Sequence, residues 1–134
     1  MGLSKGKARD KTKGEIKMKQ LKNLFNLSCS VSVYVPSTKD VNVKMSEAQH
    51  KEYIDKVLTE LSNLFGGATA YDAKGSWVSQ QGLVLEDIKV CKSYCTSEQL
   101  KAGVDKVISL CMELKSELGQ EAISLEINNK LYFI

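Results

Sequence analysis

The chain has 134 residues, of which 43% are hydrophobic and 26% are charged, and its formal net charge at pH 7 is +3. This composition is typical of one globular domain that is large enough to bury a core without disulfide bonds. No apolar run approaches the roughly 20 residues that cross a bilayer, so the sequence predicts a cytoplasmic protein without a membrane partner.

Positive charge is concentrated at the N-terminus. Residues 1–22 carry eight basic and two acidic side chains, whereas the rest of the chain carries 11 lysines and 14 acids. Such an arm favours an anionic partner, which would be a nucleic acid, a ribonucleoprotein or an acidic protein surface; a solubilising tail is the alternative. The candidate contact residues are Lys5, Lys7, Arg9, Lys11, Lys13, Lys17, Lys19 and Lys22.

Residues 1–27 are predicted to form this basic arm, and residues 28–134 the folded domain. Met18, Leu21 and Phe25 have the spacing of a short amphipathic helix within the arm. The domain begins with a strand over residues 28–35, in which apolar and polar side chains alternate, and Pro36 ends it. Tyr34, on the polar face of this strand, is a further candidate for partner contact.

Two helices have clear start and stop signals. The first is predicted over residues 46–65, because Ser46 and Gln49 form a capping box and glycines follow Phe65. The second is predicted to begin at Thr96, again with a glutamine three residues later, and to stop at Gly119.

Two hairpins are predicted beside these helices. Residues 68–94 form the first, with a turn at residues 79–82, and residues 122–134 form the second around two asparagines. In residues 83–94 the apolar positions shift from odd to even numbers, which predicts a β-bulge near Glu86 and Asp87. The order β-α-β-β-α-β with one added strand predicts an α+β, ferredoxin-like fold with two helices on one face of the sheet.

Residues suited to catalysis or metal binding are few. His50 is the only histidine and is expected at the surface, while Cys29 and Cys111 fall on apolar faces and are expected in the core. Cys91 and Cys95 lack the clustering of a zinc site, so the sequence predicts neither a metal nor a cofactor. Glu86 and Asp87, with Asp72 across the hairpin, could hold Mg²⁺ or act as acid and base, but solvated surface charge is the preferred interpretation.

Several short segments occur in a fixed order: YVPST at 34–38, FGGATA at 65–70, GSW at 75–77, LVLE at 83–86, SYC at 93–95 and GQEA at 119–122. This set resembles a family of small bacterial proteins of unknown function carried on plasmids, phages and other mobile elements. The resemblance covers about residues 33–134 and excludes the basic arm. It implies a mobile-element setting and supplies no activity.

These observations predict a non-enzymatic binding or inhibitor protein of a mobile element that engages nucleic acid or a nucleoprotein, for example an inhibitor of a CRISPR nuclease. The alternative is a protein or enzyme that binds a small ligand at the hairpin of residues 69–86, with Thr69, Trp77 and Glu86 as its candidate pocket residues.

Overall fold

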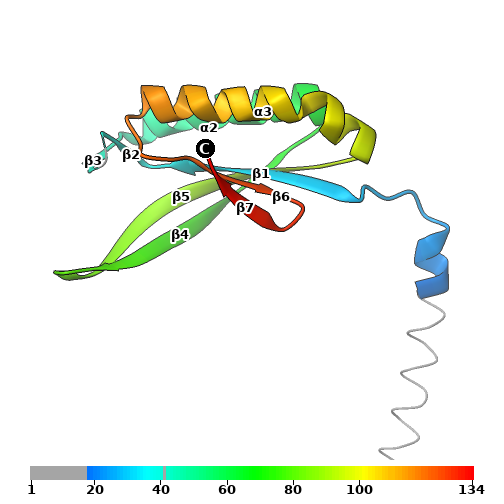
Figure 1. The fold of residues 1–134 in the computed structure, drawn as a ribbon, viewed down its shortest axis with the longest axis horizontal. Helices are drawn as coiled ribbons and strands as arrows, with labels where there is room; N and C mark the ends of the chain where they lie inside the picture. The colour runs from blue at the N-terminus through cyan, green and yellow to red at the C-terminus, as the bar shows by residue number, and fades with distance from the viewer. Residues whose placement is uncertain (1–17, 41) are drawn as a thin grey trace, which may run out of the picture.

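The computed structural model describes residues 18–40 and 42–134. They form a five-stranded sheet with the order β4-β5-β1-β6-β7, in which each neighbouring pair is antiparallel. Helices α2 (Glu47–Phe65) and α3 (Ser97–Glu117) cover one face of this sheet, whereas no described element covers the other face (Figure 1). The strands are β1 (Cys29–Pro36), β4 (Thr69–Ser79), β5 (Gly82–Cys95), β6 (Ser124–Ile127) and β7 (Lys130–Phe133), with a separate pair β2 (Thr38–Lys39) and β3 (Val43–Lys44).

The predicted ferredoxin-like fold is confirmed. Strand β1 lies at the centre, β5 and β6 flank it, and the helices follow β1 and β5 in the chain. The extra strand β7 extends the sheet beyond β6. It is joined to β6 by a tight turn in which Asn128 and Asn129 both have positive φ (49° and 68°), as a two-residue hairpin requires.

Both predicted capping boxes are present. The Ser46 hydroxyl accepts from the Gln49 N–H over 3.2 Å, and Thr96 does the same with Gln99 over 3.1 Å. Gly66 ends α2 in the left-handed region with a φ of 92°. These local bonds satisfy the first N–H groups of each helix and explain why both helices begin where the sequence predicts.

The core lies between the two helices and the face of the sheet that they cover. Val31, Val33 and Val35 of β1 are fully buried there, with Leu61 of α2 and Leu114 of α3 also inaccessible to solvent. This face is the apolar side of the alternation in β1. It brings the helices and the sheet together by removing large aliphatic side chains from water.

All four cysteines are buried and free, as the sequence predicts for Cys29 and Cys111. Burial raises the pKa of Cys91 to about 11 and that of Cys111 to about 12. Since the thiolate is the nucleophile, these thiols should react with a disulfide reagent at pH 8 at least about 100-fold more slowly than in the urea-unfolded chain. A timed titration of native and unfolded protein measures this ratio, and rapid native modification at Cys91 or Cys111 would contradict the core assignment.

The β-bulge predicted near Glu86 and Asp87 is wrong. The β4–β5 register runs without interruption from the pair of Thr69 and Lys92 to the pair of Ser79 and Gly82. The apolar positions change parity without a bulge, because Leu83 and Leu85 lie on the side of the sheet that faces the helices. Ile88, Val90 and Tyr94 lie on the opposite face. Residues 82–87 pair only with β4, so they extend beyond the part of the sheet that contributes to the core.

Residues 18–22 are helical, which agrees with part of the amphipathic helix predicted in the arm. This helix lies apart from the sheet and from α2 and α3 (Figure 1), and its apolar side chains are exposed. Lys19 and Lys22 belong to it, whereas Lys5, Lys7, Arg9, Lys11, Lys13 and Lys17 lie outside the described residues. Within the described ranges, no helix is long and apolar enough to span a membrane.

Candidate functional site

A cleft of about 790 Å³ lies between the first half of α2 and the β4–β5 hairpin. Its volume falls within the range of about 300–1,000 Å³ that is usual for small-molecule sites. The cleft combines apolar side chains with a charged rim. The apolar residues are Met45, Ile54, Ala70, Ala73 and Ile88, and the others are Ser37, Lys44, Glu47, His50, Lys51, Asp72, Lys74, Asp87 and Lys89.

Two ion pairs across the hairpin form one wall of the cleft. Asp72 is directly opposite Lys89, and Lys74 is directly opposite Asp87. The Lys74 Nζ lies 2.8 Å from Oδ1 of Asp87, and the Lys89 ammonium donates to Asp72. Because directly paired residues share one face of a sheet, the hairpin presents both carboxylates on the side that faces α2.

The electrostatic surroundings of Asp87 favour its ionised form. The hydrogen bond and the charge of Lys74 lower the pKa of Asp87, and the charge of Lys44 lowers it further. The same bond raises the pKa of Lys74. Asp87 therefore stays ionised at neutral and mildly acidic pH; its Oδ1 is paired with Lys74, whereas its Oδ2 has no ion-pair partner within the described residues.

His50 lies on the opposite wall, in the first turns of α2. It is half-buried rather than fully at the surface, and its Nε2 lies 3.3 Å from the Val35 carbonyl. A bond to a carbonyl requires that Nε2 carries the hydrogen, which leaves Nδ1 as a proton acceptor. The only histidine of the chain thus has a fixed ring orientation next to the cleft.

The predicted pocket residues Thr69, Trp77 and Glu86 do not come together. Thr69 and Trp77 are eight positions apart on one strand, which corresponds to roughly 26 Å. Thr69 lines a separate hollow of about 410 Å³ with Lys92 and Tyr94. Glu86 accepts a hydrogen bond from Thr38 over 3.2 Å, and Trp77 is exposed near the hairpin turn. None of the three lines the larger cleft, although the hairpin that carries them forms its wall.

Tyr34, the predicted contact residue of β1, lies on the face of the sheet that points away from the helices. Its hydroxyl donates to Glu126 over 3.5 Å, and its pKa is raised by burial and by the charge of that carboxylate. On the same face the Lys92 ammonium lies 4.8 Å from the centre of the Tyr94 ring. Ser32 is buried between these groups and its hydroxyl has no partner in the described part of the chain. This cluster is separated from the cleft by the sheet.

The sequence singled out Asp72 and Asp87 as carboxylates of the hairpin, but it did not indicate that lysines neutralise both of them. The sequence also gave no sign that His50 lies near these carboxylates, because the residues are far apart along the chain. In the residues that the structure describes, no group of three or more His, Cys, Asp or Glu side chains could hold a metal ion. The arrangement suits an organic ligand that has an apolar portion and charged groups.

Comparison with known protein families and with curated protein sequences finds no match. Among solved structures, the chain is similar to a phage SAM lyase in its apo state, with a TM-score of 0.58 and 18% identity. It is also similar to a phage SAM lyase in complex with S-methyl-5′-thioadenosine, with a TM-score of 0.54 and 20% identity. Each similarity covers 84% of this chain and 92% of the other.

These similarities contradict two predictions from the sequence. The chain was predicted to be a non-enzymatic binding or inhibitor protein directed at nucleic acid, and both parts of that prediction are wrong because the matching fold is that of an enzyme that processes a small molecule. The error arose from the weight placed on the arm, whose described residues, 18–27, do not line the cleft. The chain shares the fold of the phage SAM lyase over most of its length, and the alternative prediction of a small-ligand site at the hairpin agrees with this likeness.

Proposed function

We propose that the chain is an enzyme that binds S-adenosylmethionine (SAM) in the cleft between α2 and the β4–β5 hairpin and releases S-methyl-5′-thioadenosine. The observation that carries this proposal is the cleft itself, which joins an apolar floor to an ionised carboxylate. The fold shared with the phage SAM lyase supports the choice of substrate.

The cleft offers a partner for each part of SAM. Met45 and Ile54 provide apolar surface for the adenosyl group. Asp87 provides negative charge for the sulfonium, since opposite charges attract. Lys44 has no ion-pair partner within residues 18–40 and 42–134, so it remains available for the carboxylate of the substrate.

The reaction breaks the bond between the sulfur and the four-carbon amino-acid chain. In an elimination, a base takes a proton from the carbon next to the one bonded to sulfur, and the electron pair of that C–H bond becomes a new carbon–carbon double bond. The sulfur keeps the electron pair of the broken bond, so the products are a neutral thioether and an unsaturated amino acid. His50 is suited to accept a proton at Nδ1, because its Nε2 is held by the Val35 carbonyl. No metal or cofactor is needed for this step.

Incubation of the full chain with SAM should yield S-methyl-5′-thioadenosine, which liquid chromatography with mass spectrometry measures directly. S-adenosylhomocysteine, whose sulfur is uncharged, is the matched control and should not be consumed. If calorimetry detects no SAM binding and no thioether forms, the proposal is wrong. Cleavage of both compounds would also contradict it, because the sulfonium would then have no role.

A mobile-element setting is part of this proposal. The resemblance to small proteins of plasmids and phages implies such a setting, and the phage source of the similar lyase supports it. Because SAM is made and used in the cytoplasm, an enzyme that consumes it would work there.

A further inference from the structure

Two of the four buried thiols lie directly opposite each other at one end of the sheet. The register pairs Cys29, the first residue of β1, with Cys95, the last residue of β5. Residues that are directly paired across antiparallel strands point to the same face of the sheet. Both side chains belong to the core, so this face is the one that the helices cover.

The backbone holds the two cysteines at a separation that a disulfide can bridge. The Ser30 carbonyl accepts from the Asn128 N–H over 3.1 Å, so the main-chain polar groups of Ser30 point toward β6. Because these groups alternate in direction along a strand, those of Cys29 point toward β5, which makes Cys29 and Cys95 a hydrogen-bonded pair. The Cα atoms of such a pair are about 5.5 Å apart, within the range of about 4.4–6.8 Å found in disulfides.

The surroundings of the two sulfurs agree with this register. Burial raises the pKa of Cys95, and the negative charge of the Cys29 thiolate raises it further, because two neighbouring thiolates repel each other. The side-chain amide of Asn128 donates to the Cys29 Sγ over 3.8 Å. A thiol sulfur is a weak acceptor, so the loss of this contact is a small obstacle when the Cys29 side chain turns toward Cys95.

The other two cysteines are not placed for the same bond. Cys91 lies four residues before Cys95 on β5, which corresponds to about 13 Å along a strand and exceeds the span of a disulfide. Cys111 lies on α3, in the other layer of the fold. The register therefore selects one pair among the four free thiols.

The position of the pair also gives a small oxidant a way to reach it. Cys29 is 8% exposed, whereas Cys91, Cys95 and Cys111 are inaccessible to solvent. Cys29 and Cys95 form the terminal pair of the β1–β5 ladder, and residues at the end of a strand open locally at a lower free-energy cost than residues at its centre. Cys29 is thus the thiol that a small oxidant meets first.

We propose that Cys29 and Cys95 form a reversible disulfide when the chain meets a low-molecular-weight disulfide such as oxidised glutathione. The Cys29 thiolate attacks one sulfur of the reagent, whose S–S bond breaks and releases one thiolate. The Cys95 thiolate then attacks the Cys29 sulfur of this mixed disulfide and releases the second. The two protons of the cysteines pass to the released thiolates, so the pair is oxidised by two electrons and the reagent is reduced to two thiols.

The spacing of the strands favours a bond that is easily reduced. The Cβ atoms of a hydrogen-bonded cross-strand pair are up to about 5.5 Å apart, whereas those of a disulfide are about 3.5–4.5 Å apart. A disulfide that must draw the strands together is strained and therefore labile. The pair remains reduced in a compartment rich in reduced glutathione and responds when the pool becomes oxidised. The inference does not depend on the proposed enzyme activity, since neither cysteine lines the cleft.

Equilibration of the native full chain in buffers that range from reduced to oxidised glutathione tests the inference. The thiols are then trapped in acid and alkylated, and the products are identified by intact mass and peptide mapping. In the oxidised buffer the chain should lose two hydrogen atoms and yield one cross-linked peptide that joins Cys29 to Cys95. In the reduced buffer it should return to four free thiols.

Cys29→Ser and Cys95→Ser should each lose this product. Cys91→Ser is the matched control, because Cys91 lies on the same strand and the same face as Cys95, and it should retain the product. Circular dichroism checks the fold of each variant, and the peptide map of the wild-type chain decides the question without any substitution.

A wild-type chain that keeps four free thiols in oxidised glutathione would overturn the inference. A cross-link that involves Cys91 or Cys111, or that joins two chains, would also do so. A stable mixed disulfide of glutathione on Cys29 would show that Cys95 does not reach it. A bond between Cys29 and Cys95 that persists in the reduced buffer would contradict the reversible role.

Discussion

Leu114→Ala is expected to lower the free energy of unfolding by about 2–5 kcal/mol, the range measured for large-to-small substitutions in protein cores. Leu114 is fully buried on α3, where it packs between α2 and the sheet. Alanine would remove three carbon atoms and leave a cavity that the surrounding strands cannot fill without breaking their register. Urea denaturation followed by circular dichroism measures the change in midpoint.

Met112→Ala provides the comparison on the same helix. Met112 is exposed, so its loss should change the free energy of unfolding by less than about 0.5 kcal/mol. Both variants should be compared at one protein concentration, because association of copies would stabilise the folded state by mass action. Equal effects at the two positions would show that α3 does not pack on the sheet through Leu114.

Asp87→Lys is expected to weaken SAM binding by about 100-fold. The substitution removes the exposed anion that we assign to the sulfonium and places a like charge directly opposite Lys74. Each of these changes disfavours a cation in the cleft. Isothermal titration calorimetry with SAM gives the affinity, and a thermal melt checks that the variant is folded.

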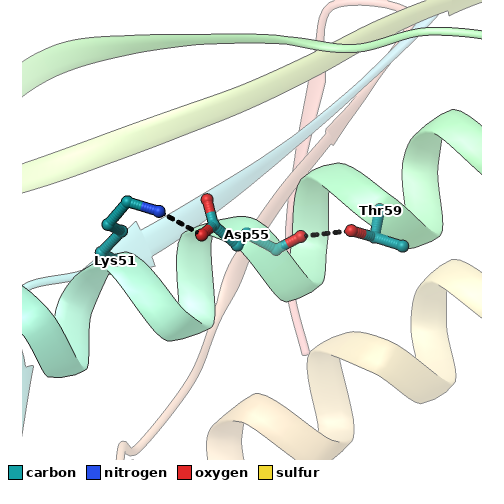
Figure 2. A network of polar contacts seen from close by, with 3 residues as sticks. All are labelled: Lys51, Asp55 and Thr59. Atoms are coloured by element: carbon teal, nitrogen blue, oxygen red, sulfur yellow. Dashed lines mark hydrogen bonds and ion pairs between the residues drawn. The ribbon is translucent and has the colours of Figure 1, made fainter.

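The control for this charge reversal is Asp55→Lys on α2. Figure 2 shows that the Asp55 carboxylate pairs with Lys51. The main-chain carbonyl of Asp55 accepts a hydrogen bond from the Thr59 hydroxyl over 2.8 Å. Asp55 is not part of the cleft lining, so the same change in net charge should leave SAM affinity within about twofold, as expected of an exposed pair. Equal losses for both variants would reflect net charge alone and would contradict the role given to Asp87.

The affinity for SAM, measured as a function of pH, should also follow the protonation of Asp87. The hydrogen bond from Lys74 is the main cause that lowers the pKa of this carboxyl. Asp87 is therefore still an anion at the pH where an ordinary aspartate becomes protonated, and the anion is lost only as the pH falls through the lowered pKa. Affinity should therefore persist to below about pH 4, the ordinary value for aspartate.

Local patterns in the sequence determined the elements and their order. The Ser46–Gln49 capping box and the glycines after Phe65 define α2 because they act within a few residues along the chain. The alternation in β1 identified the core face for the same reason, since it depends only on strand geometry. From these signals the ferredoxin-like fold could be assembled without any knowledge of long-range contacts.

The cleft was decided by tertiary structure alone. His50 comes from α2, whereas Asp87 and Lys89 come from β5, and the fold brings them to one cavity. The ion pairs on its wall depend on which residues of β4 and β5 stand opposite each other, and that register is a product of the whole hairpin. The shift of apolar positions in β5 suggested a bulge because a single strand cannot reveal where its neighbour ends. Only the sheet shows that β1 stops pairing at Ile88, and that the apolar positions before and after this residue lie on opposite faces of β5.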